Sequence, residues 1–176
     1  MPPTQPPRTA LITGASRGIG AEIARAVAAT GAQTILAARS QSGCDEVAAR
    51  IHGSGGHART YALDVTDRAS VAALADELES GVDWLINNAG IIRRGVITDS
   101  TDDDYVQSMA VNVEAPFRIC RAAIPILAAN GGGAIVNVSS CWGVRPGPNH
   151  PLYCMSKAAL ASMTQCLGHD HAHQGI

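Results

Sequence analysis

The stretch Thr9–Gly20, TALITGASRGIG, decides the fold of this 176-residue chain. Its first five residues form a short apolar run, which is typical of a buried strand. The glycine-rich segment leads into a helical pattern, with Ile23 and Val27 on one side and an end near Gly31. Such a turn lets the backbone approach a ligand, and the free N–H groups and dipole of a helix N-terminus favour an anion. The stretch therefore predicts a strand, a phosphate-binding turn and a helix, although a glycine motif alone also fits an ordinary tight turn.

Short apolar runs and helical patterns alternate along the rest of the chain. Strands that alternate with helices usually pair in parallel. We therefore expect an α/β fold, a Rossmann-like doubly wound parallel sheet of five strands, in one dinucleotide-binding domain at 9–176 after a flexible Pro-rich arm at 1–8. The expected later strands are Thr34–Ala38, Arg59–Leu63, Val82–Ile86 and Ala134–Val138. The expected later helices are Cys44–Ile51, Arg68–Leu78, a span from Thr101 to Ala129 bent by Pro116 and Pro125, and a last helix from near Tyr153 to about His173.

Composition excludes several classes of function. Aromatic residues make up only 3% of the chain, which argues against a base-stacking platform, and a formal net charge of -2 implies neither nucleic acid nor an anionic membrane as partner. The N-terminus lacks the apolar core of a signal peptide, and no run approaches membrane-spanning length, so we expect a cytoplasmic protein. Five cysteines without a C-x-x-C pair fit a reducing compartment.

No metal site is expected from the two clusters that invite one. The three aspartates Asp102–Asp104 follow Thr101, as in a capped helix start, and consecutive side chains on a helix diverge. His169 and His173 lie four residues apart near the end of the last helix, where imidazoles favour the negative end of the helix dipole.

Tyr153 and Lys157 lie four residues apart, so on a helix both side chains can address one site. An ammonium beside a phenol stabilises the phenolate, which suits the proton exchange of carbonyl reduction or alcohol oxidation. Lys157 is the only lysine among thirteen basic residues. Ser140 follows the fifth expected strand, so its hydroxyl can converge with the phenol on one oxygen atom. The Y-x-x-x-K spacing alone also arises by chance.

Ala38 and Arg39 stand where dinucleotide sites often carry an acidic residue for the ribose 2′-hydroxyl. Without that carboxylate, and with Arg17 and Arg39 available for a 2′-phosphate, the sequence favours NADP, while NAD remains possible. Either arginine also fits a solvated surface charge.

Two asparagines have more than one interpretation. Asn87 opens the NNAG segment at the carboxyl end of a strand, where open α/β sheets bind ligands, but it equally fits a structural role between strands. Asn112 lies inside an apolar helical span, where an amide needs partners; it either structures a kink or holds water near the ligand.

In combination these motifs resemble the classical short-chain dehydrogenases/reductases over nearly the whole chain from Thr9 onward. The motifs that carry the resemblance are TGASRGIG at 13–20, NNAG at 87–90, Asn112, Ser140, and Tyr153 with Lys157. The resemblance implies an NAD(P)-dependent oxidoreductase that transfers hydride between nicotinamide and a secondary alcohol or ketone. It implies Tyr153 as general acid and base, Ser140 on the substrate oxygen, Lys157 on the nicotinamide ribose and Asn112 beside a relay water. The cofactor-binding residues that it implies are Gly14, Ser16, Arg17, Gly18, Ile19, Gly20, Arg39, Asp64, Val65, Asn88, Ala89, Gly90, Tyr153 and Lys157.

The end of the chain departs from that family. Classical relatives continue past Gly175–Ile176 into a sixth strand, a turn against the nicotinamide, a substrate-covering segment and a seventh strand. We therefore expect an incomplete domain that lacks the last two strands, with the fifth strand as an exposed edge and one wall missing from the pocket. The chain would then be either a C-terminally truncated form of a longer enzyme or a protein whose missing wall comes from elsewhere.

Three functional hypotheses follow from the resemblance. The segment 87–94, NNAGIIRR, is similar to the gluconate and deoxygluconate dehydrogenase branch, and Arg93, Arg94 and Arg145 are candidates for a sugar-acid carboxylate, although exposed arginines are often only solvated. The alternatives are a 3-oxoacyl carrier-protein reductase and a catalytically idle nucleotide-binding remnant. By analogy with relatives we expect a homodimer through the two long helices, Asp103–Ala129 and Tyr153–His173.

Overall fold

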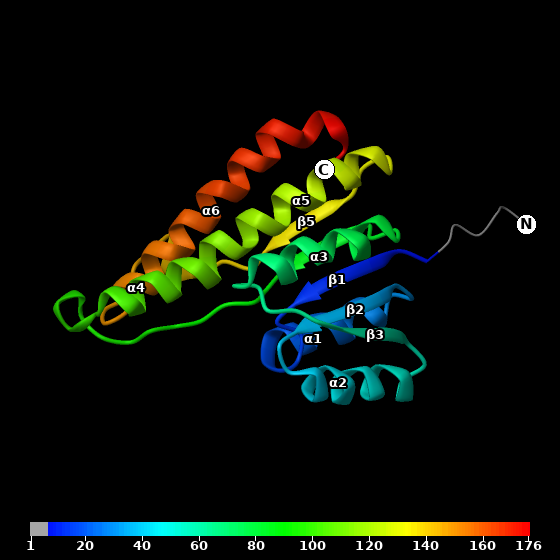
Figure 1. The fold of residues 1–176 in the computed structure, drawn as a ribbon, viewed down its shortest axis with the longest axis horizontal. Helices are drawn as coiled ribbons and strands as arrows, with labels where there is room; N and C mark the ends of the chain where they lie inside the picture. The colour runs from blue at the N-terminus through cyan, green and yellow to red at the C-terminus, as the bar shows by residue number, and fades with distance from the viewer. Residues whose placement is uncertain (1–6) are drawn as a thin grey trace, which may run out of the picture.

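A parallel five-stranded sheet in the order β3-β2-β1-β4-β5 forms the centre of the molecule (Figure 1), which is known from a computed structural model that describes residues 7–176. The strands are β1 (Thr9–Thr13), β2 (Gln33–Ala38), β3 (His57–Ala62), β4 (Trp84–Asn87) and β5 (Ala134–Asn137). From β1 the chain continues to β2 and β3 on one side, and then returns to β4 and β5 on the other side of β1. The order of the strands therefore reverses between β1 and β4. Open sheets of this kind bind ligands at that switch point. The predicted Rossmann-like fold is confirmed.

Helices cover both faces of this sheet. They are α1 (Gly18–Ala28), α2 (Gln41–Gly53), α3 (Arg68–Glu79), α4 (Asp102–Met109), α5 (Ala115–Ala129) and α6 (Pro151–His171). Ala10 and Ile12 of β1 pack in one core with α1 and α2, whereas Leu11, their neighbour in sequence, packs in the other core with α3 and α5. Because both faces are covered, β1 is a continuous apolar run rather than an alternating pattern.

The strand boundaries predicted from sequence differ from the structure by one or two residues, apart from β1, which matches. The larger difference is α2, which begins at Gln41 rather than Cys44. The hydroxyl of Ser40 accepts a hydrogen bond from the backbone N–H of Gly43 and so satisfies one of the unpaired donors of the first turn. Ser40 therefore starts the helix before its apolar pattern begins.

The predicted long helix from Thr101 to Ala129 is interrupted. Its start is as expected: the Thr101 hydroxyl accepts from the Asp104 N–H and the Asp104 carboxylate accepts from the Thr101 N–H, which is a capping box. Between α4 and α5, however, the residues Ala110–Glu114 form a π-helical turn. Pro116 carries no N–H for the carbonyl of Asn112 four residues earlier, which leaves the helical ladder free to widen there. The interruption is therefore a π turn around Asn112, and Pro125 lies within the continuous helix α5.

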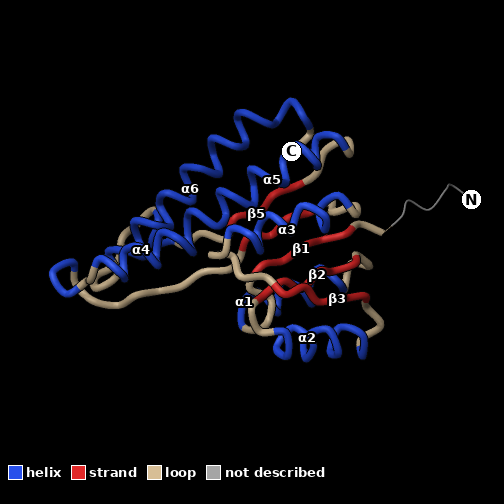
Figure 2. Tube along the Cα trace, in the orientation of Figure 1, coloured by secondary structure: helices blue, strands red, loops and turns tan. Residues whose placement is uncertain are grey.

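The loops that leave the carboxyl ends of the strands gather at one end of the sheet (Figure 2). β5 forms one edge of the described sheet, and Val136 is 53% exposed there, which agrees with the exposed edge expected from the sequence. The proline-rich arm predicted at 1–8 lies outside the described residues over 1–6. Among residues 7–176, no helix is both long and apolar enough to cross a membrane.

Candidate active site

The turn between β1 and α1 favours glycine at three positions. Gly14 and Gly18 have φ of 67° and 58°, a region that favours glycine. A Cβ on Gly14 would lie 2.9 Å from the Cα of Ala89, and one on Gly20 would lie 2.3 Å from the Gly14 carbonyl oxygen. The turn therefore packs directly against the segment after β4, with α1 beginning at its end.

Thr13 and Asn88 hold the two sides of the switch point together. The Thr13 hydroxyl accepts hydrogen bonds from the backbone N–H groups of Asn88 (3.0 Å) and Ala89 (3.1 Å). In return the Asn88 side-chain amide donates to the carbonyls of Thr13 (3.0 Å) and Gly14 (3.3 Å). Asn88 thus fixes the glycine turn and borders the adjacent cavity. Thr13 opens the TGASRGIG motif, but the sequence did not reveal its hydrogen-bonding role.

A cavity of about 790 Å³ extends from the glycine turn to the first turns of α6. Every residue predicted to bind cofactor lines it, from Gly14 through Gly90 to Tyr153 and Lys157. Two predicted catalytic residues, Asn112 and Ser140, are not among the lining residues. The residues that line the cavity but were not predicted are Ala38, Ser40, Gly43, Leu63, Thr66, Ile91, Ile92, Val111, Val138 and Ser139.

Charges on the cavity rim are mostly positive near the glycine turn. The side chains of Arg17 and Arg39 are exposed and border the cavity. Asp64, across from them, accepts two hydrogen bonds from Thr66 (2.7 and 2.9 Å), and these bonds, with a smaller contribution from Arg39, lower the pKa of its carboxyl below the ordinary value. Asp64 is therefore an anion at neutral pH that is held by its own loop.

Tyr153 and Lys157 lie on the first turns of α6 at the other end of the cavity. Lys157 is only 4% exposed, and its ammonium lies 5.8 Å from the centre of the Tyr153 ring. Its Nζ donates a 2.7 Å hydrogen bond to the carbonyl of Val138 at the end of β5. Burial lowers the pKa of this lysine, because desolvation disfavours the charged form. The fold thus holds the single lysine of the chain beside the phenol, as its spacing predicted.

The two serines after β5 have different surroundings. The Ser140 hydroxyl accepts a 3.2 Å hydrogen bond from the backbone N–H of Trp142 and caps the short 3₁₀ turn Cys141–Gly143. The Ser139 hydroxyl donates a 2.8 Å bond to the carbonyl of Lys157 and borders the cavity. The family resemblance selected Ser140, because nothing local in the sequence distinguishes two adjacent hydroxyls after a strand.

Asn112 is completely buried and satisfied by hydrogen bonds. Its amide donates to the carbonyl of Ile91 and to the hydroxyl of Ser156, and its oxygen accepts from the Ile91 N–H, all within 3.0 Å. The Ser156 hydroxyl in turn donates to the carbonyl of Tyr153 (2.9 Å). Asn112 therefore belongs to the π turn, as its predicted role in a kink requires, and joins that turn to α6.

Asn87 has the structural role that the sequence left open. Its amide donates to the Asn137 side chain on β5 (2.8 Å) and contacts the thiol of Cys120 (3.3 Å), so it points between the strands and α5. Burial raises the pKa of Cys120 to about 11, partly offset by the hydrogen bond that the thiol accepts from Asn87 and by the one that it donates to Asn137. This thiol is therefore protonated at neutral pH.

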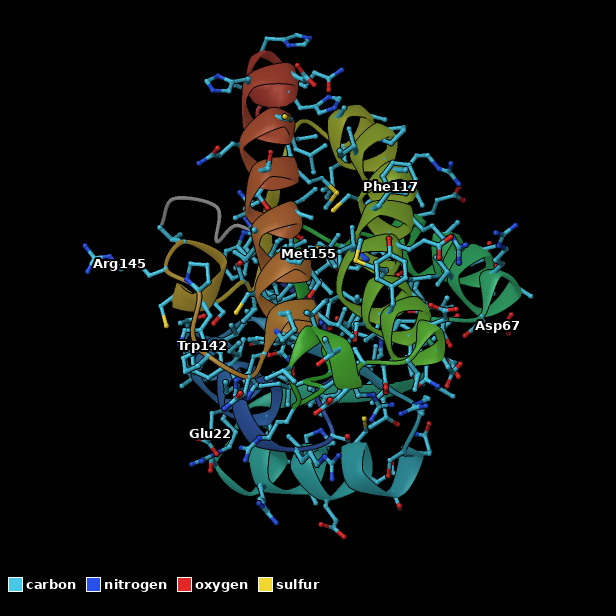
Figure 3. The ribbon with its side chains drawn as sticks, turned by 90° about the vertical axis from the view of Figure 1, so that its left-hand side faces the viewer. Glu22, Asp67, Phe117, Trp142, Arg145 and Met155 are labelled. Atoms are coloured by element: carbon cyan, nitrogen blue, oxygen red, sulfur yellow. The ribbon has the colours of Figure 1, made fainter. Side chains whose placement is uncertain are left out.

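The three arginines considered for a substrate carboxylate differ in their partners. Arg93 hydrogen-bonds Gln107 and lies 3.5 Å from the Asp104 carboxylate, so it is engaged by α4. Arg94 and Arg145 are exposed and have no ion pair within residues 7–176. Figure 3 shows Arg145 extending outward from the loop that precedes α6. In the described part of the chain, no group of three or more His, Cys, Asp or Glu side chains is arranged to hold a metal ion.

A parallel sheet with a glycine-rich turn at its switch point and a Tyr–Lys pair across the cavity defines a dinucleotide-binding α/β protein of the Rossmann class. Residues 8–176 match the family model described as short chain dehydrogenase. The chain belongs to the short-chain dehydrogenase/reductase family of oxidoreductases.

Relatives in this family are longer than the chain. It is 38% identical over 173 residues to the oxidoreductase UcpA of Escherichia coli K12, covering 96% of this chain and 65% of UcpA. Among solved structures, a provisionally assigned NAD(P) dependent gluconate 5-dehydrogenase from Beutenbergia cavernae with bound NADP is 34% identical, with a TM-score of 0.91 over 98% of this chain and 70% of that one. A 3-oxoacyl (acyl-carrier-protein) reductase from Agrobacterium tumefaciens C58 with NADP bound is 32% identical, with a TM-score of 0.91 over 96% and 66%.

The packing of the glycine turn makes a testable prediction. We expect Gly20→Ala to lower the free energy of unfolding by about 1–3 kcal/mol, because the new methyl group meets backbone that cannot move aside. The measurement is urea denaturation. The matched control is Gly53→Ala at the end of α2, where a Cβ meets nothing within 4 Å, and where we expect a change within about 1 kcal/mol. Equal effects of the two substitutions would contradict the tight turn.

Proposed function

We propose that the chain carries the cofactor-binding and catalytic residues of an NADP-dependent oxidoreductase, which transfers hydride between nicotinamide and a secondary alcohol or ketone. One observation carries the proposal: a single cavity of about 790 Å³ has the glycine turn at one end and the Tyr153–Lys157 pair at the other. A dinucleotide is a ligand with an anionic centre and a reactive ring at one end. The cavity offers each part the chemistry it needs, because backbone N–H groups suit the pyrophosphate and a proton donor suits the reaction.

The residues present fit NADP better than NAD. Gly14 and Gly20 line the cavity, and a Cβ on either would collide with the backbone of the turn or of the segment after β4. Ala38, at the end of β2, provides no carboxylate for a ribose 2′-hydroxyl, and the exposed guanidinium groups of Arg17 and Arg39 are free to pair with a 2′-phosphate. Asp64 and Val65 border the part of the cavity that would hold the adenine. The cofactor supplies the hydride, and the protein supplies position and charge.

Tyr153 acts as the general acid in reduction and as the general base in oxidation. Its phenol gives a proton to the carbonyl oxygen of a ketone, and its phenolate takes one from the hydroxyl of an alcohol. Lys157, held by the Val138 carbonyl, places positive charge beside the ring and favours the phenolate that forms. Since the Ser140 oxygen already accepts from the Trp142 N–H, its own hydrogen remains available to the substrate oxygen.

Asn112 contributes by holding other groups in place. Its side chain is hydrogen-bonded to Ile91 and Ser156, so it holds the π turn against the helix that carries Tyr153. A relay water at Asn112 would donate a hydrogen bond to its main-chain carbonyl. Pro116, four residues later, has no N–H to bond that carbonyl as in a regular helix.

For the substrate, we propose a sugar or sugar acid, with a 3-oxoacyl thioester as the alternative. Arg94 and Arg145 have no ion pair with any residue of 7–176 and are our candidates for a carboxylate, whereas Arg93 is engaged by Gln107 and Asp104. Structures similar to this chain include a provisionally assigned gluconate 5-dehydrogenase and a 3-oxoacyl (acyl-carrier-protein) reductase, so both substrate classes belong in the assay. A chain that binds NADPH and reduces neither class would instead be a nucleotide-binding protein without catalysis.

We also propose that the protein forms a homodimer through α4–α5 and α6. These helices pack side by side and present apolar side chains to solvent: Tyr105, Val106, Phe117 and Met155 are 43 to 58% exposed. Figure 3 looks onto this surface, with Phe117 and Met155 on adjacent helices. Exposed apolar patches of this kind mark interaction sites.

Substitution at this surface tests the dimer. We expect light scattering to give a dimer for the unchanged protein and Phe117→Asp to weaken dimerisation at least about 30-fold, because a buried aromatic anchor becomes a charge. The matched control is Val144→Asp, which changes an exposed residue outside these helices. A monomer before substitution, or equal effects of both changes, would contradict the proposal.

Tyr153→Phe tests the catalytic role. Removal of the phenol hydroxyl should lower NADPH-dependent reduction of the best ketone about 100- to 10,000-fold, because general acid catalysis is lost, while NADPH affinity stays within about twofold. Tyr61→Phe on β3 is the matched control and should keep full activity. The proposal would be wrong if Tyr153→Phe retained turnover, or if it lost cofactor binding in the same proportion.

Arg39→Gln tests the cofactor preference. The loss of a charge-assisted contact should raise the dissociation constant of NADPH about 10- to 100-fold and leave that of NADH unchanged. Arg50→Gln on α2, which removes an exposed arginine outside the cavity, should change neither constant. Calorimetry with both cofactors measures the four values. Equal losses for NADPH and NADH would show that Arg39 does not read the 2′-phosphate.

A further inference from the structure

Trp142 lies in the loop before α6, in the short 3₁₀ turn Cys141–Gly143 (Figure 3). The centre of its ring system is 6.2 Å from that of Tyr153, and the two planes meet at 82°, which is the edge-to-face arrangement that aromatic pairs prefer. On another side, its ring lies 4.4 Å from the ring of His150. Trp142 is therefore in contact with the residue directly before α6 and with the proposed proton donor.

The surroundings of Trp142 leave it little freedom. A Cβ on Gly147 would lie 2.9 Å from the indole, so the backbone of the loop packs directly against the ring. A Cβ on Gly143 would lie 2.8 Å from the carbonyl of Lys157, so the 3₁₀ turn is also pressed onto the backbone of α6. The Trp142 N–H is bonded to the Ser140 hydroxyl. The turn, the indole and α6 thus form one packed unit.

A second contact fixes the far end of this loop. The carbonyl of Asn149 accepts a 2.9 Å hydrogen bond from the N–H of Gly95, in the segment that follows β4. Asn149 has φ of 60°, the left-handed region that asparagine tolerates better than most residues. This bond holds Asn149, the residue directly before His150, and the His150 ring packs against the indole. The loop that carries Trp142 is therefore tied to the segment that follows β4.

We propose that Trp142 is a positioning residue for the reaction: it holds the Tyr153 ring in the single orientation from which the phenol reaches the substrate oxygen. The inference rests on the proposed function, since it assigns Trp142 a role through Tyr153. Tyr153 is half-buried in the first turn of α6, and the Lys157 ammonium, which the Val138 carbonyl holds, lies 5.8 Å from its ring centre. At that distance the ammonium attracts the ring. The indole packs against the ring itself and restricts its rotation. Small errors in the placement of a reacting group are costly in rate.

Three variants test this role: Trp142→Ala removes the indole, Trp142→Phe keeps an aromatic edge, and Val144→Ala alters an exposed side chain of the same loop. We expect Trp142→Ala to lower kcat about 10- to 100-fold with NADPH affinity unchanged within about twofold. Trp142→Phe should recover most of this loss, and Val144→Ala should match the unchanged protein. An unaltered kcat in Trp142→Ala, or a loss that follows a fall in NADPH affinity and melting temperature, would overturn the proposal.

A second measurement separates this inference from the proposed activity. Protein labelled with 3-fluorotyrosine carries three labelled sites, Tyr61, Tyr105 and Tyr153, and the Tyr153→Phe variant assigns the last. Because one fluorine makes the two edges of the ring distinct, a held Tyr153 ring flips slowly, and we expect a broadened or split fluorine resonance in the unchanged protein and in Trp142→Phe. In Trp142→Ala the freed ring should flip fast and give one narrow, averaged resonance. The same line shape in all three proteins would overturn the role of Trp142. If the unchanged protein binds NADPH but reduces no ketone, the proposed function fails, and the fluorine spectra alone decide about Trp142.

Discussion

The buried amide of Asn112 is the contact on which the geometry of the site depends. It is completely excluded from solvent, yet each of its polar atoms has a partner, in Ile91 after β4 and in Ser156 on α6. A buried polar group left without its partner costs about 1–3 kcal/mol, so this arrangement is strongly preferred over any that separates the three segments. The Ser156 hydroxyl extends the connection to the backbone of Tyr153. The position of α6 is therefore set by hydrogen bonds as well as by apolar packing.

The π turn is what allows that contact. The extra residue of the π turn and the missing N–H of Pro116 place Asn112 where the segment after β4 passes α6. At the other end of the cavity, Thr13 and Asn88 play the equivalent part for the glycine turn. Two small polar networks thus fix the two ends of one cavity, and the sheet between them sets its length.

Sequence reasoning was strongest where the structural signal is local. β1 and the glycine turn were predicted well because an apolar run and glycines that require positive φ are properties of a few adjacent residues. The start of α2 was missed because it depends on a side-chain cap at Ser40 rather than on apolar spacing. The family motifs indicated the residues of the cavity, although these lie far apart in the chain.

The remaining features depend on partners that periodicity does not reveal. The partners of Asn112 are 21 and 44 residues away, so a kink and a water site could not be distinguished from sequence. The partner of Asn87 on β5 is 50 residues away and turns that amide from the cavity into the interior. Arg93 was a candidate for substrate binding until the packing of α4 placed Asp104 and Gln107 beside it. Trp142 carried no motif, and only its contacts with His150 and Tyr153 give it a role.

A crystal structure of the protein with NADP tests the central claim most directly, because it shows whether one ligand spans the cavity. The account predicts the pyrophosphate at the N-terminus of α1, the 2′-phosphate between Arg17 and Arg39, and the nicotinamide ring beside Tyr153 and Lys157. A dinucleotide bound elsewhere, or one whose nicotinamide lies out of reach of the Tyr153 hydroxyl, would contradict it.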